Sequence, residues 1–404
     1  MTISSGKDIE SNNQKSLTFN KRPVFLILIF TFTVSFDGTI AIPIISNYAI
    51  DLGASKAMAG FIVGVYSIVH IPSNIFLGRL VDKLGRKGLI SLGIFLDGLS
   101  MLLYSLAQDP LFLLFARVIH GLGGGFGGPA TMAYFSDATS QRRSGRGMAL
   151  YGISIGFSNL IGFMLGGMLA QKIGYSNLFF LIAIVLFIMC LFSFSLPSIY
   201  KPPEESITFK EEFKIVKQTI FRKSMISPYI STLTLMFNLG IITATYTIML
   251  KTAFYTDGQI GIILSIMVIF SILVHYPAGI LSDKLGYIKV MLIGLILTAL
   301  AFGILMTSLK SPIPMIGMIF FGLGHGMIFP SSASVIKDKT SDSESGIATG
   351  MFYALIVAGV AIGAPISGLV YHIYTDQTTL LLGIVAPLIV SVILIFLLRS
   401  SQKN

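Results

Sequence analysis

The fold of this chain is decided by a short charged turn between two long apolar runs, Gly78-Arg79-Leu80-Val81-Asp82-Lys83-Leu84-Gly85-Arg86-Lys87. The pattern of glycine, aspartate, lysine and glycine returns once, 201 positions later, as Gly279-Ile280-Leu281-Ser282-Asp283-Lys284-Leu285-Gly286. Since 201 is about half of the 404 residues, the second half of the chain repeats the first.

The same offset holds along the whole length without a gap. It aligns Asp37 with Asn238, Gly60 with Gly261, Gly121 with Gly322, Gly123 with Gly324, Pro129 with Pro330, Asp137 with Asp338, Gly162 with Gly363 and Gly167 with Gly368. A parallel duplication of two six-helix halves is typical of membrane transporters that rock one half against the other.

Composition independently places the chain in a bilayer. Hydrophobic residues make up 54% and charged residues 11%, with a mean hydropathy of +0.84. A soluble domain carries roughly 25% charged residues. The net charge of +10 does not indicate nucleic-acid binding, because the basic residues lie in short loops between apolar runs. The one cysteine, Cys190, lies inside such a run, which excludes a disulfide within the chain and a cysteine metal cluster.

Twelve apolar runs are each long enough to cross a hydrocarbon core, which takes about 20 residues. We therefore expect an all-α integral membrane protein with twelve transmembrane helices in two six-helix pseudo-repeats around a central cavity. The expected parts are a cytosolic tail (1–22), an N-terminal bundle (23–197), a cytosolic linker (198–226), a C-terminal bundle (227–398) and a second tail (399–404). The first tail lacks the apolar core of a cleavable signal peptide.

The loops show a strong charge asymmetry. The tails, the linker and the loops on their side hold 23 of the 28 lysines and arginines, whereas the opposite loops hold only four. An excess of this size predicts that both termini are cytosolic. We expect a monomer in the plasma membrane.

The chain resembles the major facilitator superfamily over nearly its full length. Gly78, Asp82, Gly85, Arg86 and Lys87 match that family's signature loop between its second and third helices, G-x-L-x-D-x-x-G-R-K. The weaker second copy retains Gly279, Asp283 and Gly286. We expect these residues to form a cytoplasmic gate in which Asp82 pairs with Arg86 and Lys87. The alternative is that the basic residues only set the orientation in the membrane.

Asp37 is the foremost ionisable residue inside a span, where charge is costly and usually functional. Its surroundings, Phe36 to Pro43, resemble the first helix of drug–proton antiporters. Arg117 lies at a similar depth, and Arg117-x-x-His120-Gly121-x-Gly123 resembles the fourth-helix motif that the family associates with proton coupling. We expect Asp37 and Arg117 to pair as the coupling site. The alternatives are a permanent helix-holding carboxylate and an arginine that only clamps backbone carbonyls.

Two glycine-rich segments qualify the resemblance. The run from Gly121 to Pro129 has no preceding strand, so it indicates close helix contact rather than dinucleotide binding. In the fifth span, Gly162-Phe163-Met164-Leu165-Gly166-Gly167 resembles the antiporter signature G-P-x-x-G-G, with phenylalanine where the proline should be. The signature is therefore half present; the missing proline weakens the assignment to export and supports uptake as the alternative.

Other polar groups inside the spans are candidates for the substrate cavity: His120, Tyr151, Asn159, Asn238, His275, His325 and Tyr353. A histidine satisfied by a neighbouring helix is the alternative for His275 and His325. Asp97 lies on the third span, which is peripheral in this fold, and we expect it to pair with a group on the second span such as His70.

The sequence carries no enzyme or ATP-binding motif, so we expect no catalytic residues, cofactor or metal. Energy then comes from an ion gradient, and protons are the simplest choice. The leading function is export of lipophilic or cationic small molecules by proton antiport and alternating access. Uptake of a small metabolite, proton-coupled or facilitated, is the alternative, and a non-transporting receptor on the same fold is a third.

Overall fold

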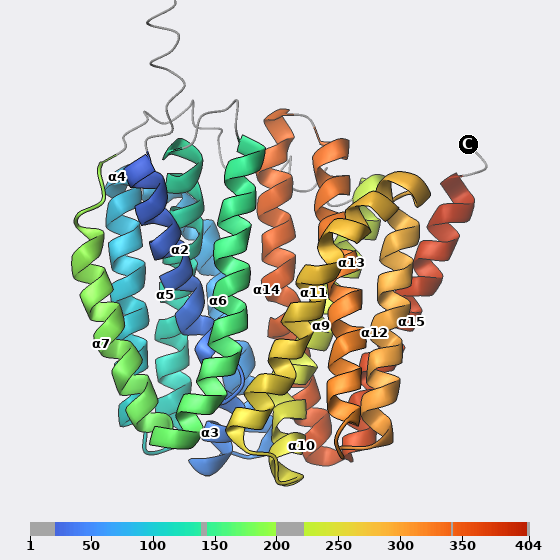
Figure 1. The fold of residues 1–404 in the computed structure, drawn as a ribbon, viewed down its shortest axis with the longest axis horizontal. Coiled ribbons are helices and arrows are strands. Elements are labelled where there is room, and N and C mark those ends of the chain that lie inside the picture. The colour runs from blue at the N-terminus through green and yellow to red at the C-terminus, as the bar shows by residue number, and fades with distance from the viewer. Residues whose placement is uncertain (1–20, 139–143, 199–221, 341, 402–404) are drawn as a thin grey trace, which may run out of the picture.

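A computed structural model describes residues 21–138, 144–198, 222–340 and 342–401 (Figure 1). The described residues form helices joined by short loops, and twelve of these helices are long and apolar enough to cross a membrane. The N-terminal elements are α2 (Lys21–Ala41), α3 (Ile45–Asp51), α4 (Lys56–Leu106), α5 (Pro110–Ala138), α6 (Ser144–Ile173) and α7 (Tyr175–Ser193). The C-terminal elements are α9 (Lys223–Ile241), the π-helical turn η2 (Ile242–Tyr246), α10 (Thr247–Thr252), α11 (Asp257–Leu285), α12 (Tyr287–Thr307), α13 (Ile313–Lys339), α14 (Asp342–Ile373) and α15 (Asp376–Ser401). The predicted fold class is confirmed.

The two halves break their helices at corresponding places. Gly85 (φ 69°) divides α4 into two spans, and Gly286 (φ 87°) separates α11 from α12 201 residues later. Both backbones lie at positive φ, which glycine adopts without steric cost. The second repeated glycine of the signature loop, Gly85 and its equivalent Gly286, therefore marks a helix boundary in both halves. The predicted linker, residues 198–226, lies almost wholly outside the described residues.

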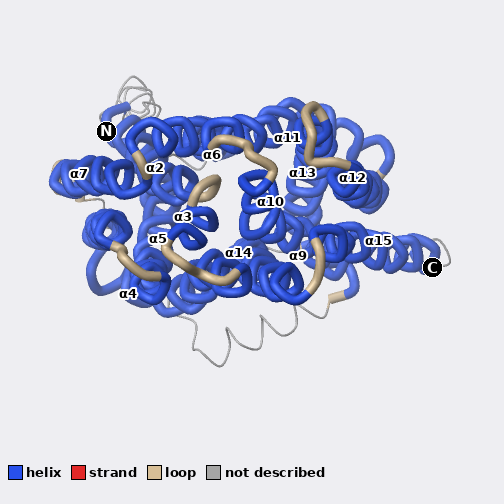
Figure 2. The backbone as a smooth tube through the Cα atoms, turned by 90° about the horizontal axis from the view of Figure 1, so that it is seen from below, coloured by secondary structure: helices blue, strands red, loops and turns tan. Residues whose placement is uncertain are grey.

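Helices α2 to α7 pack on one another as one bundle, and α9 to α15 pack as a second. The bundles meet through two helix pairs, α4 with α14 and α6 with α11 (Figure 1). Between these pairs, α3 lies against α10 at the centre of the molecule (Figure 2).

Repeated glycines form the contacts between the bundles. A Cβ added to Gly60 on α4 would stand 2.7 Å from the Cα of Gly368 on α14. A Cβ added to Gly261 on α11 would stand 3.3 Å from the Cα of Gly167 on α6. Since Gly60 is the repeat equivalent of Gly261, and Gly167 of Gly368, the two contacts are related by the internal two-fold symmetry.

A hydrogen bond lies on the symmetry axis itself. Ser46 Oγ on α3 and Thr247 Oγ1 on α10 are 2.6 Å apart, and these residues are 201 positions apart in the chain. Only residues near an axis contact their own repeat equivalents, so this bond marks where the pseudo-symmetry axis passes.

All of these contacts lie at the end of the bundles remote from the chain termini. Towards the other end, α6 and α11 diverge (Figure 1). There Ile153 on α6 and Tyr276 on α11 have exposed side chains. The described glycine contacts between the bundles thus lie at the end where α3 and α10 lie, and α6 and α11 lie farther apart towards the other end (Figure 1).

Polar groups add to these contacts between the bundles, which we call the outer seam because the loop charges predict that this end faces outward. Asp257 on α11 accepts a hydrogen bond from the Tyr175 hydroxyl of the other bundle (3.0 Å) and pairs with Lys251 (2.7 Å). Lys56 Nζ of α4 lies 3.6 Å from the centre of the Tyr371 ring of α14, a cation–π contact between the bundles. The outer seam therefore combines glycine contacts with ionic ones.

Asp51 is expected to make the outer seam sensitive to pH. Its side chain reaches solvent, yet the surrounding protein raises the pKa of its carboxyl; Lys251 opposes this rise and Asp257 adds to it. Protons then bind Asp51 more tightly in the closed arrangement than in one where water surrounds it. Lowering the pH through the raised pKa should therefore stabilise the closed seam, and this stabilisation should be lost as the pH rises above it.

Spin labels on the outer loops at Gln108 and Lys310, one in each bundle, would measure this closure as a distance. In Asp51→Asn the carboxyl is replaced by a neutral amide, so the low-pH part of the titration should disappear. Asp109→Asn is the matched control, because Asp109 only caps α5 through the backbone N–H groups of Leu111 and Phe112. An unchanged titration in Asp51→Asn would contradict the assignment.

Candidate functional site

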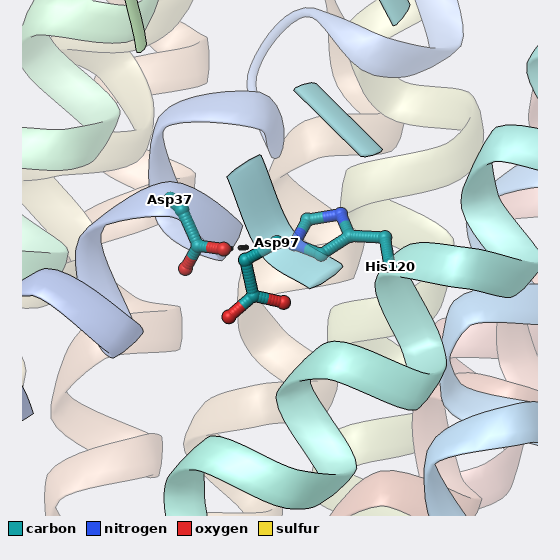
Figure 3. A group of neighbouring side chains, drawn as sticks. All are labelled: Asp37, Asp97 and His120. Atoms are coloured by element: carbon teal, nitrogen blue, oxygen red, sulfur yellow. Dashed lines mark hydrogen bonds and ion pairs between the residues drawn. The ribbon is translucent and has the colours of Figure 1, made fainter. Parts of the chain in front are cut away.

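A cluster of ionisable side chains is sealed inside the N-terminal bundle. It joins Asp37 of α2, Asp97 and Tyr104 of α4, and Arg117 and His120 of α5. Asp97 is 0% exposed, Asp37 and His120 are 1% exposed, and Arg117 is 6% exposed. Figure 3 shows Asp37, Asp97 and His120 converging from their three helices. Ionisable groups so deep in a membrane bundle are costly and mark function more often than structure.

The hydrogen bonds of the cluster form a chain in which each group donates to the next, from Arg117 to Asp37. Arg117 can only donate, and its Nη1 lies 3.3 Å from the Tyr104 hydroxyl and 3.4 Å from His120 Nδ1. The Tyr104 hydroxyl therefore donates to His120 Nδ1 (2.8 Å). His120 then carries its proton on Nε2 and donates to Asp37 Oδ2 (3.2 Å). A neutral imidazole thus connects the arginine to the carboxylate.

The predicted direct pair of Asp37 with Arg117 is wrong in this conformation, because His120 and Tyr104 stand between them. Arg117 instead donates to the backbone carbonyls of Ile62 (3.1 Å) and Val63 (3.2 Å) on α4. It also lies 4.9 Å from the centre of the Tyr66 ring. Arg117 is therefore both a clamp on α4 and the cation of the cluster, and its role in coupling stays a prediction.

Asp97 lies where the sequence did not place it. It was expected to pair with His70, but no described hydrogen bond joins the two residues, and ligand atoms of Asp97, Asp37 and His120 lie within 4.8 Å of one another (Figure 3). Neither Asp97 oxygen accepts a hydrogen bond from the described residues. The depth of Asp97 was readable from the sequence, but the direction in which its helix face points was not.

Glycines of α5 allow the cluster to be this compact. The run from Gly121 to Pro129 lies within the helix, as predicted, and not in a nucleotide-binding loop. A Cβ at Gly123 would overlap Asp97 Oδ1, and one at Gly121 would stand 2.6 Å from the backbone oxygen of Tyr66. Close approach of α4 to α5 thus depends on these glycines.

The C-terminal bundle has no counterpart of the cluster. The equivalents of Asp37, Asp97, Tyr104, Arg117 and His120 are Asn238, Thr298, Leu305, Met318 and Phe321. All five of these are buried. Since the same fold is built without the charges, folding alone does not account for them.

The two signature loops, which we predict to form a gate, have matching contacts in the two halves. Arg86 forms an ion pair with Asp137 of α5 and donates to the backbone oxygen of Ala133 (2.6 Å). At the equivalent positions, the Tyr287 hydroxyl donates to Asp338. In the second copy, a tyrosine thus takes the place of the arginine, and the aspartate that it contacts is retained.

Contacts are described for only some of the other residues in these loops. Lys87 donates to the backbone oxygen of Phe194 (2.6 Å), and Asp283 of the second copy is exposed. The side chains of residues 74–84, including Asp82, lie outside the described residues, so the predicted latch remains a prediction.

Of four residues predicted to line the cavity, three are buried and one is partly exposed. His120 and Asn238 are 1% and 0% exposed, so placing them in a cavity was wrong; Asn238 donates instead to the Gly383 backbone oxygen (3.0 Å). Tyr151 is also buried, with its hydroxyl 3.3 Å from Thr131 Oγ1. Asn159 is partly exposed.

Histidines and aromatic rings of the second bundle form a continuous row. The His325 ring stacks on Phe329 (6.0 Å between centres), His275 meets the same ring edge-on, and Phe352 connects Phe329 to Tyr353. His325 also hydrogen-bonds Ser271 (2.8 Å), while Tyr353 is 40% exposed. We call this row the aromatic row. Their shared position on α11, α13 and α14 was not readable from the sequence.

The fold consists of two like bundles of apolar helices that contact each other at one end, and one of them contains a sealed ionisable cluster. This is the architecture of a secondary membrane transporter. The family model described as Major Facilitator Superfamily matches residues 27–229 and again residues 228–404. The chain belongs to the Major Facilitator Superfamily.

Individual relatives agree with this assignment. An MFS-type transporter of Methanocaldococcus jannaschii is 27% identical over 353 residues, covering 85% of this chain and 90% of that protein. The multi-drug resistance efflux pump PmrA homolog of Lactococcus lactis is 24% identical, covering 89% and 92%. The crystal structure of the nucleoside transporter NupG has the same fold, with a TM-score of 0.75 at 17% identity over 93% of this chain and 99% of that one.

Proposed function

We propose that this transporter exports lipophilic or cationic small molecules in exchange for protons. The observation that carries the proposal is the sealed chain from Arg117 through Tyr104 and His120 to Asp37, which the second bundle lacks. A buried carboxylate whose surroundings change between two conformations takes up and releases a proton. Efflux is further supported by relatives whose names describe multidrug resistance, among them MdtG of Escherichia coli.

The aromatic row supports the substrate class. Stacked aromatic and histidine rings offer apolar faces, and aromatic faces attract cations as well as lipophilic groups. Sugars would instead be expected to need several amide groups. With the termini cytosolic, as the loop charges predict, the conformation described here faces inward, and Tyr353 would meet substrate entering from the cytoplasm.

Transport by this structure would alternate between two ends. Separation of the Gly60–Gly368 and Gly167–Gly261 contacts would open the outer seam, while α6 and α11 would approach at the other end. The proton would drive this change through its differential binding to the cluster in the two states.

The test uses purified protein in liposomes with a pH-sensitive dye trapped inside. Substrate gradients of lipophilic cations, organic acids, sugars and nucleosides are imposed in turn. Proton movement opposite to a lipophilic cation is the expected result. Movement in the same direction would establish symport and uptake, and transport without proton movement would exclude coupling; either result overturns the proposal.

A further inference from the structure

Asp97 is the cluster member that the proposed exchange does not yet use. It is 0% exposed, and both its oxygens are buried without a donor among the described residues. Asp37, by contrast, accepts from the Gly38 backbone N–H (2.7 Å) and from His120 (3.2 Å). An unpartnered carboxylate is much more costly to bury than a hydrogen-bonded one.

The charges around Asp97 do not balance if both acids are ionised. Asp37 of α2 and His120 of α5 lie next to it. Arg117 of α5 belongs to the same cluster and contacts Tyr66 and Tyr104, which are on the same helix as Asp97. On the α7 side, the atoms nearest to a Cβ at Gly98 belong to the apolar side chains of Phe187 and Leu186. His120 is the neutral link described above, so Arg117 is the one cation among these groups. Two carboxylates then leave one negative charge uncompensated in a sealed site.

We propose that Asp97 is a proton-binding carboxyl of the coupling site and that, of the two neighbouring acids Asp37 and Asp97, it is Asp97 that holds a proton in the conformation described here. Asp37 keeps its charge because two donors and the chain to Arg117 stabilise it. Asp97 has no such donors, so the neutral acid is its favourable form. This inference rests on the proposed proton exchange and adds a second acid to it.

Proton release from Asp97 would then act on the conformation. The O–H bond breaks, the proton leaves to water, and a second negative charge remains within 4.8 Å of the Asp37–His120 pair. Like charges at this distance in a dry site repel strongly. The sealed cluster is therefore stable only while the proton is bound, and release favours a state in which water reaches α2 and α4.

The experiment compares wild type with Asp97→Asn in the liposome assay and by pH-induced infrared difference spectroscopy of the purified protein. Asparagine mimics the protonated acid but holds no exchangeable carboxyl proton. The infrared band of a buried protonated carboxyl should disappear in this variant. The pH at which transport is half-maximal should fall by about 1 unit or more, because the repulsion between two neighbouring acids, which favours keeping a proton in the site, is then removed.

Two further variants guard against a folding artefact. Asp97→Thr introduces the residue that occupies the equivalent place in the second bundle, where Thr298 packs beside Gly324 as Asp97 packs beside Gly123. It should behave like Asp97→Asn. Thr298→Val is the matched control and should keep the wild-type band and pH profile.

Three results would overturn the proposal. The first is persistence of the infrared band in Asp97→Asn, and the second is an unchanged pH profile in that variant. The third is transport driven by a sodium gradient at constant pH, which would indicate that the two carboxylates and His120 hold a metal cation. Because the infrared measurement needs no substrate, it decides the location of the proton even if the exchange itself is absent.

Discussion

Replacing Asp37 by asparagine is expected to abolish proton-driven transport while leaving substrate exchange intact. A one-unit pH gradient is worth ~1.4 kcal/mol per coupled proton, or about a tenfold substrate gradient. Asp37→Asn should lose this entire accumulation, because the chain from Arg117 would end on an amide instead of a carboxylate. Counterflow of labelled substrate, which needs no net proton movement, should continue at a rate close to that of wild type.

The matched control for this change is Asp109→Asn, which removes an acid from the exposed start of α5. It should retain accumulation. Equal loss of counterflow and accumulation in Asp37→Asn would make Asp37 a substrate ligand, and retained accumulation would remove it from the coupling site altogether.

Substituting Gly60 by valine is expected to open the outer seam. A Cβ at Gly60 would stand 2.6 Å from the backbone oxygen of Ala364 and 2.7 Å from the Cα of Gly368. Backbone atoms cannot move aside as flexible side chains do, so the bundles must separate. Overpacking of this kind costs about 1–3 kcal/mol, which would shift the balance of conformations by about 5–150-fold.

Labels at Gln108 and Lys310 would report the shift as a longer distance between the outer loops, and Gly261→Val should reproduce it at the symmetry-related contact. The one native cysteine, Cys190, is buried, which limits background labelling. Gly303→Val is the control, since nothing lies within 4 Å of a Cβ there. If the distance between the labels in both Gly60→Val and Gly261→Val equals that of the wild type, the glycine contacts do not hold the bundles together.

The two halves of the chain have diverged in chemistry while keeping one geometry. Their glycine contacts, helix breaks and loop aspartates remain equivalent, as the Gly60 and Gly261 contacts show. Among the described residues, the sealed ionisable cluster lies in the first bundle and the aromatic row in the second. This division is consistent with proton binding in one bundle and substrate contact in the other.

The sequence by itself determined the class, the twelve spans and the internal repeat, because hydropathy and a constant offset of 201 residues are properties of the chain alone. It also identified Asp37 and Arg117 as buried charges at similar depth. The short charged turn around Gly85 was also readable between two apolar runs, and the structure breaks the helix at that glycine.

Only the tertiary structure decided which side chains meet. Depth along a helix follows from residue number, but the direction of a side chain depends on how each helix is rotated against its neighbours. That rotation inserted His120 and Tyr104 between Asp37 and Arg117 and turned Asp97 towards Asp37 instead of His70. It also paired Gly60 with Gly368 across the bundles, because close packing of backbones selects partners that no spacing along one chain can specify.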